Sequence, residues 1–293
     1  MHMRKLSLLL CFFFTAAVLA AQPAEQKRHM LWQVQGSKGT VYLAGSFHLL
    51  TEDVYPLDSI FVALFEESDM LVLEIPADSL QSPAAQRYML QKGLYQDGGT
   101  LADAVPESLY VATSEFLSGV GVPIAMFQKA RPWFMAMTLS VLQMQKLGFR
   151  AENGLDFYFA DLARKAGKPI TGLETVAEQL AIFAGMPDSL QAAFLQETLG
   201  EIGTMETSIK ELLAAWKQGD AEKIAAMLFD SMAEFPALQK RLLRDRNERW
   251  VEKIIPMLEQ GKRAYIVVGA GHLAGEFGLP SLLRQKGYRV TQL

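Results

Sequence analysis

The sequence predicts an α/β (α+β) protein whose mixed central sheet consists of two β-Gly-x-x-His-α-β halves, separated by a large, mainly helical insertion. Two matched stretches predict the sheet, because Val41–His48 and Tyr265–His272 each join a short apolar run to Gly-x-x-His. An apolar run of this length between polar turn residues is typical of a buried strand. Helical periodicity dominates residues 80–260, which places the insertion between the two halves.

The first half, residues 31–76, contains the clearest run of elements. Leu31–Val34 and Val41–Ala44 are expected to be strands of a hairpin, because the residues between them are rich in glycine. Apolar residues at helical spacing predict an amphipathic helix over Leu57–Ser68. Met70–Ile75 follows as a buried strand. The order strand, helix, strand favours a parallel α/β unit.

The insertion contains one strand signal, and the second half, residues 264–293, repeats the order of the first. A helix over Leu155–Ala166 precedes a short strand over Pro169–Leu173. Apolar residues from Leu238 to Leu258 mark one face of a long helix. The strand, helix and terminal strand of the second half are expected at Ala264–Val268, Leu279–Lys286 and Tyr288–Leu293.

The N-terminus has the pattern of a signal peptide over residues 1–20. Arg4 and Lys5 precede the apolar run Leu6–Leu19, and a small residue, Ala20, follows it. The run is short for a membrane span, so we expect cleavage and a periplasmic or extracellular protein, with an uncleaved anchor as the alternative. Residues 21–293 are then expected to form a single domain with no stable membrane span.

Composition excludes several classes of protein. The only cysteine, Cys11, lies in the leader, so the mature chain has no disulfide and no cysteine-ligated metal. The net charge is −4 and no basic stripe is present, which argues against a nucleic-acid partner. His-Glu-x-x-His, Gly-x-Ser-x-Gly and Walker motifs are all absent from the sequence.

His48 and His272 are the leading candidates for chemistry. Each follows a predicted strand, at the edge of the sheet where ligands bind in open α/β folds. Neutral imidazole is the commonest metal ligand and a common general base. Glu74 ends another predicted strand, and burying a carboxylate without a partner is costly. Two histidines and a carboxylate form a common hydrolytic metal site, and these ligands suit manganese, cobalt or zinc.

Three further groups of polar residues have a structural explanation beside a functional one. Glu174 ends the short strand of the insertion, in a context like that of Glu74. Arg131 could bind a substrate carboxylate, stabilise an oxyanion or pair with Glu74. The cluster Arg244-Asp245-Arg246-Asn247 interrupts the apolar face of the long helix. For each group, ion pairing or helix capping is the favoured explanation over a functional role.

These motifs together resemble the TraB/PrgY/GumN family, which includes the Tiki proteins, membrane-associated metalloproteases that act on Wnt ligands. The resemblance is carried by Gly45-Ser-Phe-His48, Gly269-Ala-Gly-His272 and Glu74 between them. Supporting stretches are Leu31-Trp32, Arg131-Pro132-Trp133, Gly154-Leu155-Asp156, Gly172-Leu173-Glu174-Thr175 and Arg246-Asn247.

The resemblance implies a fold related to the erythromycin esterase and ChaN-like proteins. It also implies that His48, His272 and Glu74 bind a divalent metal that activates water. Because the chain lacks the cysteines and the C-terminal membrane helix of Tiki, a Wnt-like target is not implied.

The leading hypothesis is an exported metal-dependent hydrolase, a peptidase by preference, that acts on a peptide or small-molecule substrate. One alternative is a metal-independent esterase in which His48 is the general base and Glu74 orients it. The other is a non-enzymatic module that binds haem, a metal or a peptide in the same pocket.

Overall fold

The computed structural model describes residues 28–80 and 82–293, so the predicted signal peptide lies outside the described residues. One mixed six-stranded sheet has the order β4-β3-β5-β2-β1-β6. Its strands are β1 (Leu31–Gln35), β2 (Thr40–Ser46), β3 (Met70–Leu73), β4 (Ile170–Gly172), β5 (Arg263–Gly269) and β6 (Arg289–Gln292). The predicted mixed α/β class is therefore confirmed.

The strand order places β5 between β2 and β3. These strands and β4 run parallel, whereas β1 is antiparallel to both β2 and β6. Tyr42 pairs with Tyr265 and Ser46 with Gly269, so the two Gly-x-x-His motifs leave the sheet side by side. Glu74 directly follows β3, on the other side of β5. The carboxyl ends of three neighbouring strands thus carry all three candidate residues to one edge.

Helices connect the strands and make up most of the insertion. The first half contains the 3₁₀ turn η1 (Glu52–Val54) and α1 (Ser59–Glu66), and the second half contains η5 (Ala270–Leu273) and α14 (Leu279–Gln285). The insertion contains α2 (Ala77–Leu80), α3 (Pro83–Gly93), α4 (Leu101–Ala104), α5 (Glu107–Gly119), η2 (Ile124–Phe127), α6 (Pro132–Lys146), η3 (Ala151–Asn153), α7 (Leu155–Lys165), α8 (Val176–Ala184), α9 (Asp188–Glu201), α10 (Met205–Lys217), α11 (Ala221–Ser231), α12 (Pro236–Gln239), η4 (Lys240–Arg244) and α13 (Asp245–Glu259).

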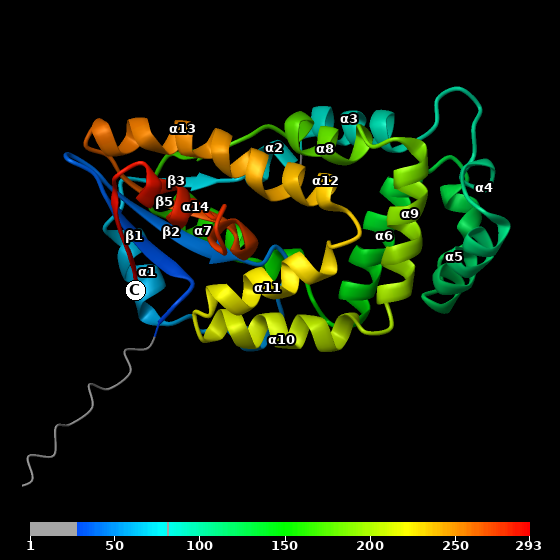
Figure 1. Ribbon diagram of the computed structural model, residues 1–293, viewed down its shortest axis with the longest axis horizontal. Helices are drawn as coiled ribbons and strands as arrows, with labels where there is room; N and C mark the ends of the chain where they lie inside the picture. Colours follow the sequence, from blue (N-terminus) through cyan, green and yellow to red (C-terminus); the bar gives the residue numbers. More distant parts are fainter. Residues whose placement is uncertain (1–27, 81) are drawn as a thin grey trace, which may run out of the picture.

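The sheet lies at one end of the molecule, and α4, α5, α6 and α9 lie at the other (Figure 1). Helices α10 and α11 and helices α12 and α13 extend between the two ends (Figure 1). The largest apolar cluster surrounds the sheet and includes the buried rings of Phe159, Trp250 and Tyr265. A second cluster, around Leu139 and Leu195, joins α6 to α9 away from the sheet.

The predicted elements differ from the observed ones in three instructive places. Helix α1 begins at Ser59 because the Asp58 side chain accepts a hydrogen bond from the backbone N–H of Ile60 and caps the helix. Strand β3 ends at Leu73, so Glu74 lies just past the strand. The predicted long helix is divided by the π-helical turn Lys240–Arg244. Helix-breaking turns of this kind occur often at functional sites.

No helix in the described residues is long and apolar enough to cross a membrane.

Candidate active site

His48, Glu74 and His272 meet at the carboxyl edge of the sheet. Nε2 of His48 lies 3.9 Å from Oε1 of Glu74, and Nε2 of His272 lies 3.8 Å from the same oxygen. Glu74 and His272 are buried, whereas the side chain of His48 is 55% exposed. The structure therefore brings together the three residues that the two motifs and the strand order had singled out, with His48 on the solvent side.

A glycine keeps the space between these side chains open. The backbone N–H of Gly269 donates a hydrogen bond of 2.7 Å to Oε1 of Glu74. A Cβ atom at position 269 would lie 3.3 Å from that oxygen and 3.8 Å from Nε2 of His48. Any larger residue at this position would therefore project into the gap between the carboxylate and the imidazole rings.

Hydrogen bonds at Nδ1 orient both histidine rings. Nδ1 of His48 lies 3.0 Å from Oδ2 of Asp156, and Nδ1 of His272 lies 2.6 Å from Oδ1 of Asn247. The Asn247 amide is fixed, because its Nδ2 donates to the carbonyls of His272 and Phe277. Both partners of Nδ1 accept, so each ring carries a proton on Nδ1 and directs Nε2 toward Glu74.

Arg246 lies behind the three residues as a buried cation. Its guanidinium pairs with Oε2 of Glu74 and with Oε1 of Glu174, the latter over 2.5 Å. Nη1 donates a 2.8 Å hydrogen bond to Nε2 of His272. The guanidinium also lies 4.6 Å from the ring centre of Trp250. Gln179 completes the network, since its Nε2 donates to both Glu74 and Glu174.

The surroundings shift the pKa of each titratable group in a definite direction. The Asp156 carboxylate raises the pKa of His48 to about 9, although partial desolvation of the half-exposed ring opposes the rise. Burial lowers the pKa of His272 to about 3, so this ring is neutral at pH 7. Burial alone would raise the pKa of Glu74, but His272 in its protonated form at low pH, together with the charges of Arg246 and His48, outweighs burial and lowers the pKa to about 2.

The network carries more negative than positive charge. The network contains three carboxylates, those of Glu74, Glu174 and Asp156. In the described residues, Arg246 is the only arginine that pairs with any of them. The raised pKa of His48 adds a second positive charge beside Asp156. The site is therefore one in which a further cation is electrostatically favoured.

A comparison with known families bears directly on this arrangement. The model of the TraB/PrgY/gumN family matches residues 30–292, which is nearly all of the chain. The chain belongs to the TraB/PrgY/gumN family. The resemblance seen in the two Gly-x-x-His motifs is therefore confirmed.

Family members with curated descriptions are distant relatives. The uncharacterized protein YbaP of Escherichia coli K12 is 27% identical over 243 residues, covering 83% of this chain and 87% of that protein. Metalloprotease TIKI2 of Danio rerio is 24% identical over 196 residues, or 56% of this chain and 37% of its own length. Metalloprotease TIKI1 of the same species is 21% identical over 320 residues, covering 92% of this chain and 64% of that protein.

No solved structure matches the chain. The likeness of the fold to the erythromycin esterase and ChaN-like proteins therefore stays a prediction.

The arginine of the site is not the one that we expected. Arg131 lies at the start of α6, and its guanidinium stacks 4.3 Å from the ring centre of Tyr95. The structure gives Glu74 a different partner, Arg246, because α13 packs against the sheet. Arg246 was visible as a charged interruption of an apolar helix face, which ion pairing also explained.

Asp156 and Gln179 were not predicted as site residues. Asp156 belongs to a stretch that supported the family resemblance, but nothing in its spacing pointed to His48, which lies 108 residues earlier. Gln179 lies in the first turns of α8, just after the capping box formed by Thr175 and Glu178. Both residues reach the site through tertiary packing alone.

The donor types of this family member suit a divalent metal, but their arrangement presents two obstacles. Around a zinc ion with bonds of about 2.1 Å, tetrahedral ligand atoms lie about 3.4 Å apart, somewhat closer than the distances observed to Glu74. Metal-binding histidines usually donate their second N–H to a carboxylate or carbonyl, as His48 and His272 do. In the described residues, however, no group of three His, Cys, Asp or Glu side chains is already arranged as a metal site. Arg246 also occupies the lone pair of His272.

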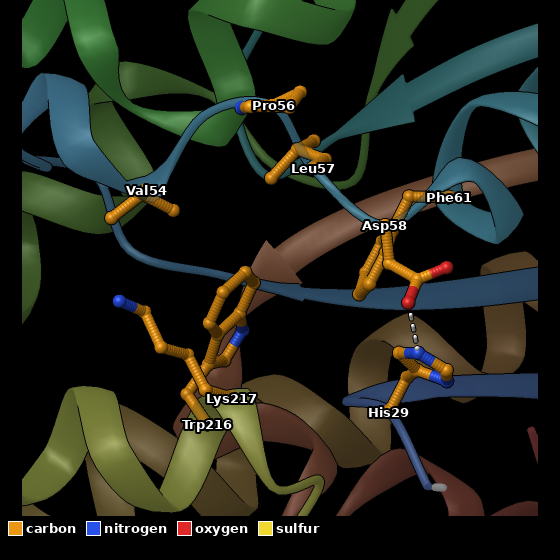
Figure 2. A pocket seen from close by; sticks show the side chains of 8 residues that line it. All are labelled: His29, Val54, Pro56, Leu57, Asp58, Phe61, Trp216 and Lys217. Carbon is orange, nitrogen blue, oxygen red and sulfur yellow. Dashed lines mark ion pairs between the residues drawn. The ribbon is translucent and has the colours of Figure 1, made fainter.

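His48, Glu74, Asp156 and Gln179 line a pocket of about 170 Å³ that opens beside the site. A larger pocket of about 350 Å³ is lined by Trp216 and Phe61, among others, and Figure 2 shows the ion pair of His29 and Asp58 at its side. None of the site residues lines this larger pocket. The smaller pocket is therefore the one that gives a substrate access to His48.

Proposed function

We propose that this protein is an exported, metal-dependent hydrolase that acts on peptide bonds. One observation carries the proposal: two histidines, each with its proton held on Nδ1, direct Nε2 toward one oxygen of a buried glutamate. This is the donor set of many hydrolytic metal sites. The export part rests on the leader at residues 1–20.

The relatives support the same choice. Proteins described as metalloproteases, TIKI1 and TIKI2, share 21% and 24% identity with this chain over the aligned residues. This identity is too low to transfer a substrate. It supports only the reaction class, which is hydrolysis at a metal site.

Each residue then has a separable role. His48, His272 and Oε1 of Glu74 would hold the ion, while Asp156 and Asn247 orient the two rings. Oε2 of Glu74 stays with Arg246 and Gln179, which keeps the carboxylate ionised and bound through one oxygen. Manganese, cobalt and zinc all suit these ligands. When bound, such an ion polarises a carbonyl and makes water easier to deprotonate.

Arg246 has to release one contact when the site is loaded. Its Nη1 donates to Nε2 of His272, while Nε and Nη2 of the same planar group hold Glu174. The guanidinium is rigid, so Nη1 leaves His272 only if the whole group tilts or shifts. Loading the site therefore also adjusts the hydrogen bonds between Arg246 and Glu174.

Elemental mass spectrometry of the purified mature chain tests the proposal. The wild type is expected to carry close to one divalent ion per chain, and the His48→Ala/His272→Ala double variant to carry none. His29→Ala is the matched control, because His29 pairs with Asp58 outside the site. A wild type that carries no ion after incubation with manganese, cobalt and zinc would contradict the proposed metal site. An ion without any peptide turnover would leave a metal-binding module.

A metal-independent esterase is a second candidate, favoured by the contact between Arg246 and His272. In this case His48 is the general base, and Asp156 orients it in place of the Glu74 that we expected. A base with its pKa raised to about 9 works only in alkaline solution. Hydrolysis that survives thorough chelation and rises steeply toward pH 9 would favour this candidate over the first.

A further inference from the structure

We infer that the pocket beside His48 receives an apolar side chain of the substrate, of the size of leucine, methionine or phenylalanine. The inference rests on the proposed hydrolase function and names the substrate class of that same site. The pocket has the site residues His48 and Glu74 at one end and apolar side chains along its walls. A substrate bond held at the site thus leaves its neighbouring side chain in this pocket.

The apolar wall residues come from several separate elements. Leu73 and Ile75 flank Glu74 at the end of β3 and are buried. Phe157 follows Asp156 on α7, and Leu80, which is 37% exposed, forms part of the rim from α2. Each polar site residue therefore has an apolar neighbour in sequence, which brings the chemistry and the apolar wall together.

The size of the pocket limits its occupant. Its volume of about 170 Å³ is below the 300–1,000 Å³ usual for a drug-sized ligand. An engineered apolar cavity of about 150 Å³ binds benzene. The pocket therefore fits a single side chain with the volume of a benzene ring and excludes a bulky ligand.

Charge favours an apolar occupant over an acidic one. Glu74 and Asp156 are the charged carboxylates on the pocket wall, and no lysine or arginine is among its lining residues in the described chain. The cations nearest these carboxylates, His48 beside Asp156 and Arg246 beside Glu74, are already paired with them, so the pocket wall offers an acidic side chain no unpaired cation among its lining residues in the described chain. A glycine has no side chain to cover the apolar walls, so it would gain no binding free energy from burying them.

Binding of blocked amino acids to the full mature chain tests the inference. The probes are the N-acetyl amides of leucine, phenylalanine, glycine, aspartate and lysine, each titrated while the His48 ring signals are followed by NMR. Leucine and phenylalanine are expected to bind at least about tenfold more tightly than glycine or aspartate, the usual discrimination of an apolar pocket. Equal binding of all five probes, or no binding of any, would overturn the inference.

Leu80→Asp tests the position of the pocket, and Leu90→Asp is its control. Leu90 is a leucine on α3 that is 51% exposed and does not line the pocket. Leu80→Asp is expected to weaken binding of the leucine probe about tenfold or more and to favour the lysine probe. Leu90→Asp is expected to leave both affinities unchanged. Identical behaviour of the two variants would place the apolar probe elsewhere.

The two proposals fail in different ways. Selective binding of apolar probes by a chain that hydrolyses no peptide would support the proposed role of the pocket and contradict the hydrolase function. Peptide hydrolysis with no preference for an apolar residue next to the cleaved bond would support the hydrolase function and contradict the proposed role of the pocket.

Discussion

Nη1 of Arg246 donates a 2.8 Å hydrogen bond to Nε2 of His272, the same nitrogen that lies 3.8 Å from Oε1 of Glu74. One guanidinium thus donates a hydrogen bond to an imidazole and, through its other nitrogens, pairs with the carboxylates of Glu74 and Glu174. A divalent ion needs the lone pair that this contact uses. Arg246 therefore links the stability of the site to the binding of its ligand.

Arg246→Met is expected to destabilise the protein strongly. The change removes the cation from two carboxylates, each at most 5% exposed, and leaves both without their arginine partner. Breaking a buried pair from one side costs about 3–5 kcal/mol, because the remaining charge is left uncompensated. Urea denaturation of the metal-free chain measures this as a fall in the free energy of unfolding.

Arg244→Met is the control, because Arg244 lies two residues earlier and forms an exposed pair with Glu248. An exposed pair of this type contributes little to stability, because water and salt screen it. If the two variants lose the same stability, the buried network does not hold the site together.

The features predicted well from sequence were those that strand ends and local periodicity control. The positions of His48, Glu74 and His272 at one edge followed from three parallel strands that end together. The choice of Arg246 over Arg131 depends on how α13 packs against the sheet. No local pattern contains that information, since Arg246 and Glu74 are 172 residues apart.

The Asp156–His48 pair predicts a strongly basic histidine in the metal-free protein. The pKa of His48 is expected near 9, well above the usual 6.5, and Asp156→Asn should lower it, because the carboxylate is the main cause of the rise. NMR titration of the imidazole Cε1–H signals measures both values. His272 is the internal reference, since burial should keep it neutral down to about pH 3.

The same pKa shifts give a signed dependence of stability on pH. His48 has a higher pKa in the folded than in the unfolded chain, so its contribution is full below about pH 6.5 and is lost as the pH rises to about 9. Glu74 has a lowered pKa, so its contribution is full above about pH 4.5 and is lost as the pH falls toward 2. Urea midpoints of the metal-free chain across this range check both signs, and a midpoint that rises from pH 7 to 9 would contradict the first.

Metal binding is expected to release protons. A histidine must be neutral to bind a metal, and His48 carries a proton at pH 7 because of its raised pKa. Each bound ion should therefore release about one proton at pH 7, about half a proton near pH 9 and progressively less at higher pH. Calorimetric titrations with zinc in buffers of different ionisation enthalpy give the number directly. Asp156→Asn should reduce the release at pH 7, and an unchanged value would separate His48 from the metal.

Gly269→Ala offers the most local test of where an ion would lie. The backbone at Gly269 has φ −49°, which alanine adopts readily, so the fold should tolerate the change. The added Cβ would lie 3.3 Å from Oε1 of Glu74 and 3.8 Å from Nε2 of His48, in the gap that the ligand atoms share. We expect metal affinity to fall roughly tenfold or more, as it does when the surroundings of a ligand are altered.

Gly119→Ala is the matched control, because a Cβ there would meet no atom within 4 Å. Thermal unfolding of the metal-free variants should show similar stability for both, so that a loss of affinity at position 269 reports on the gap alone. Undiminished metal binding by Gly269→Ala would place the ion outside the space between Glu74 and His48. In that case His48 would be free to act as a base beside Asp156, which is the role that the metal-independent esterase requires.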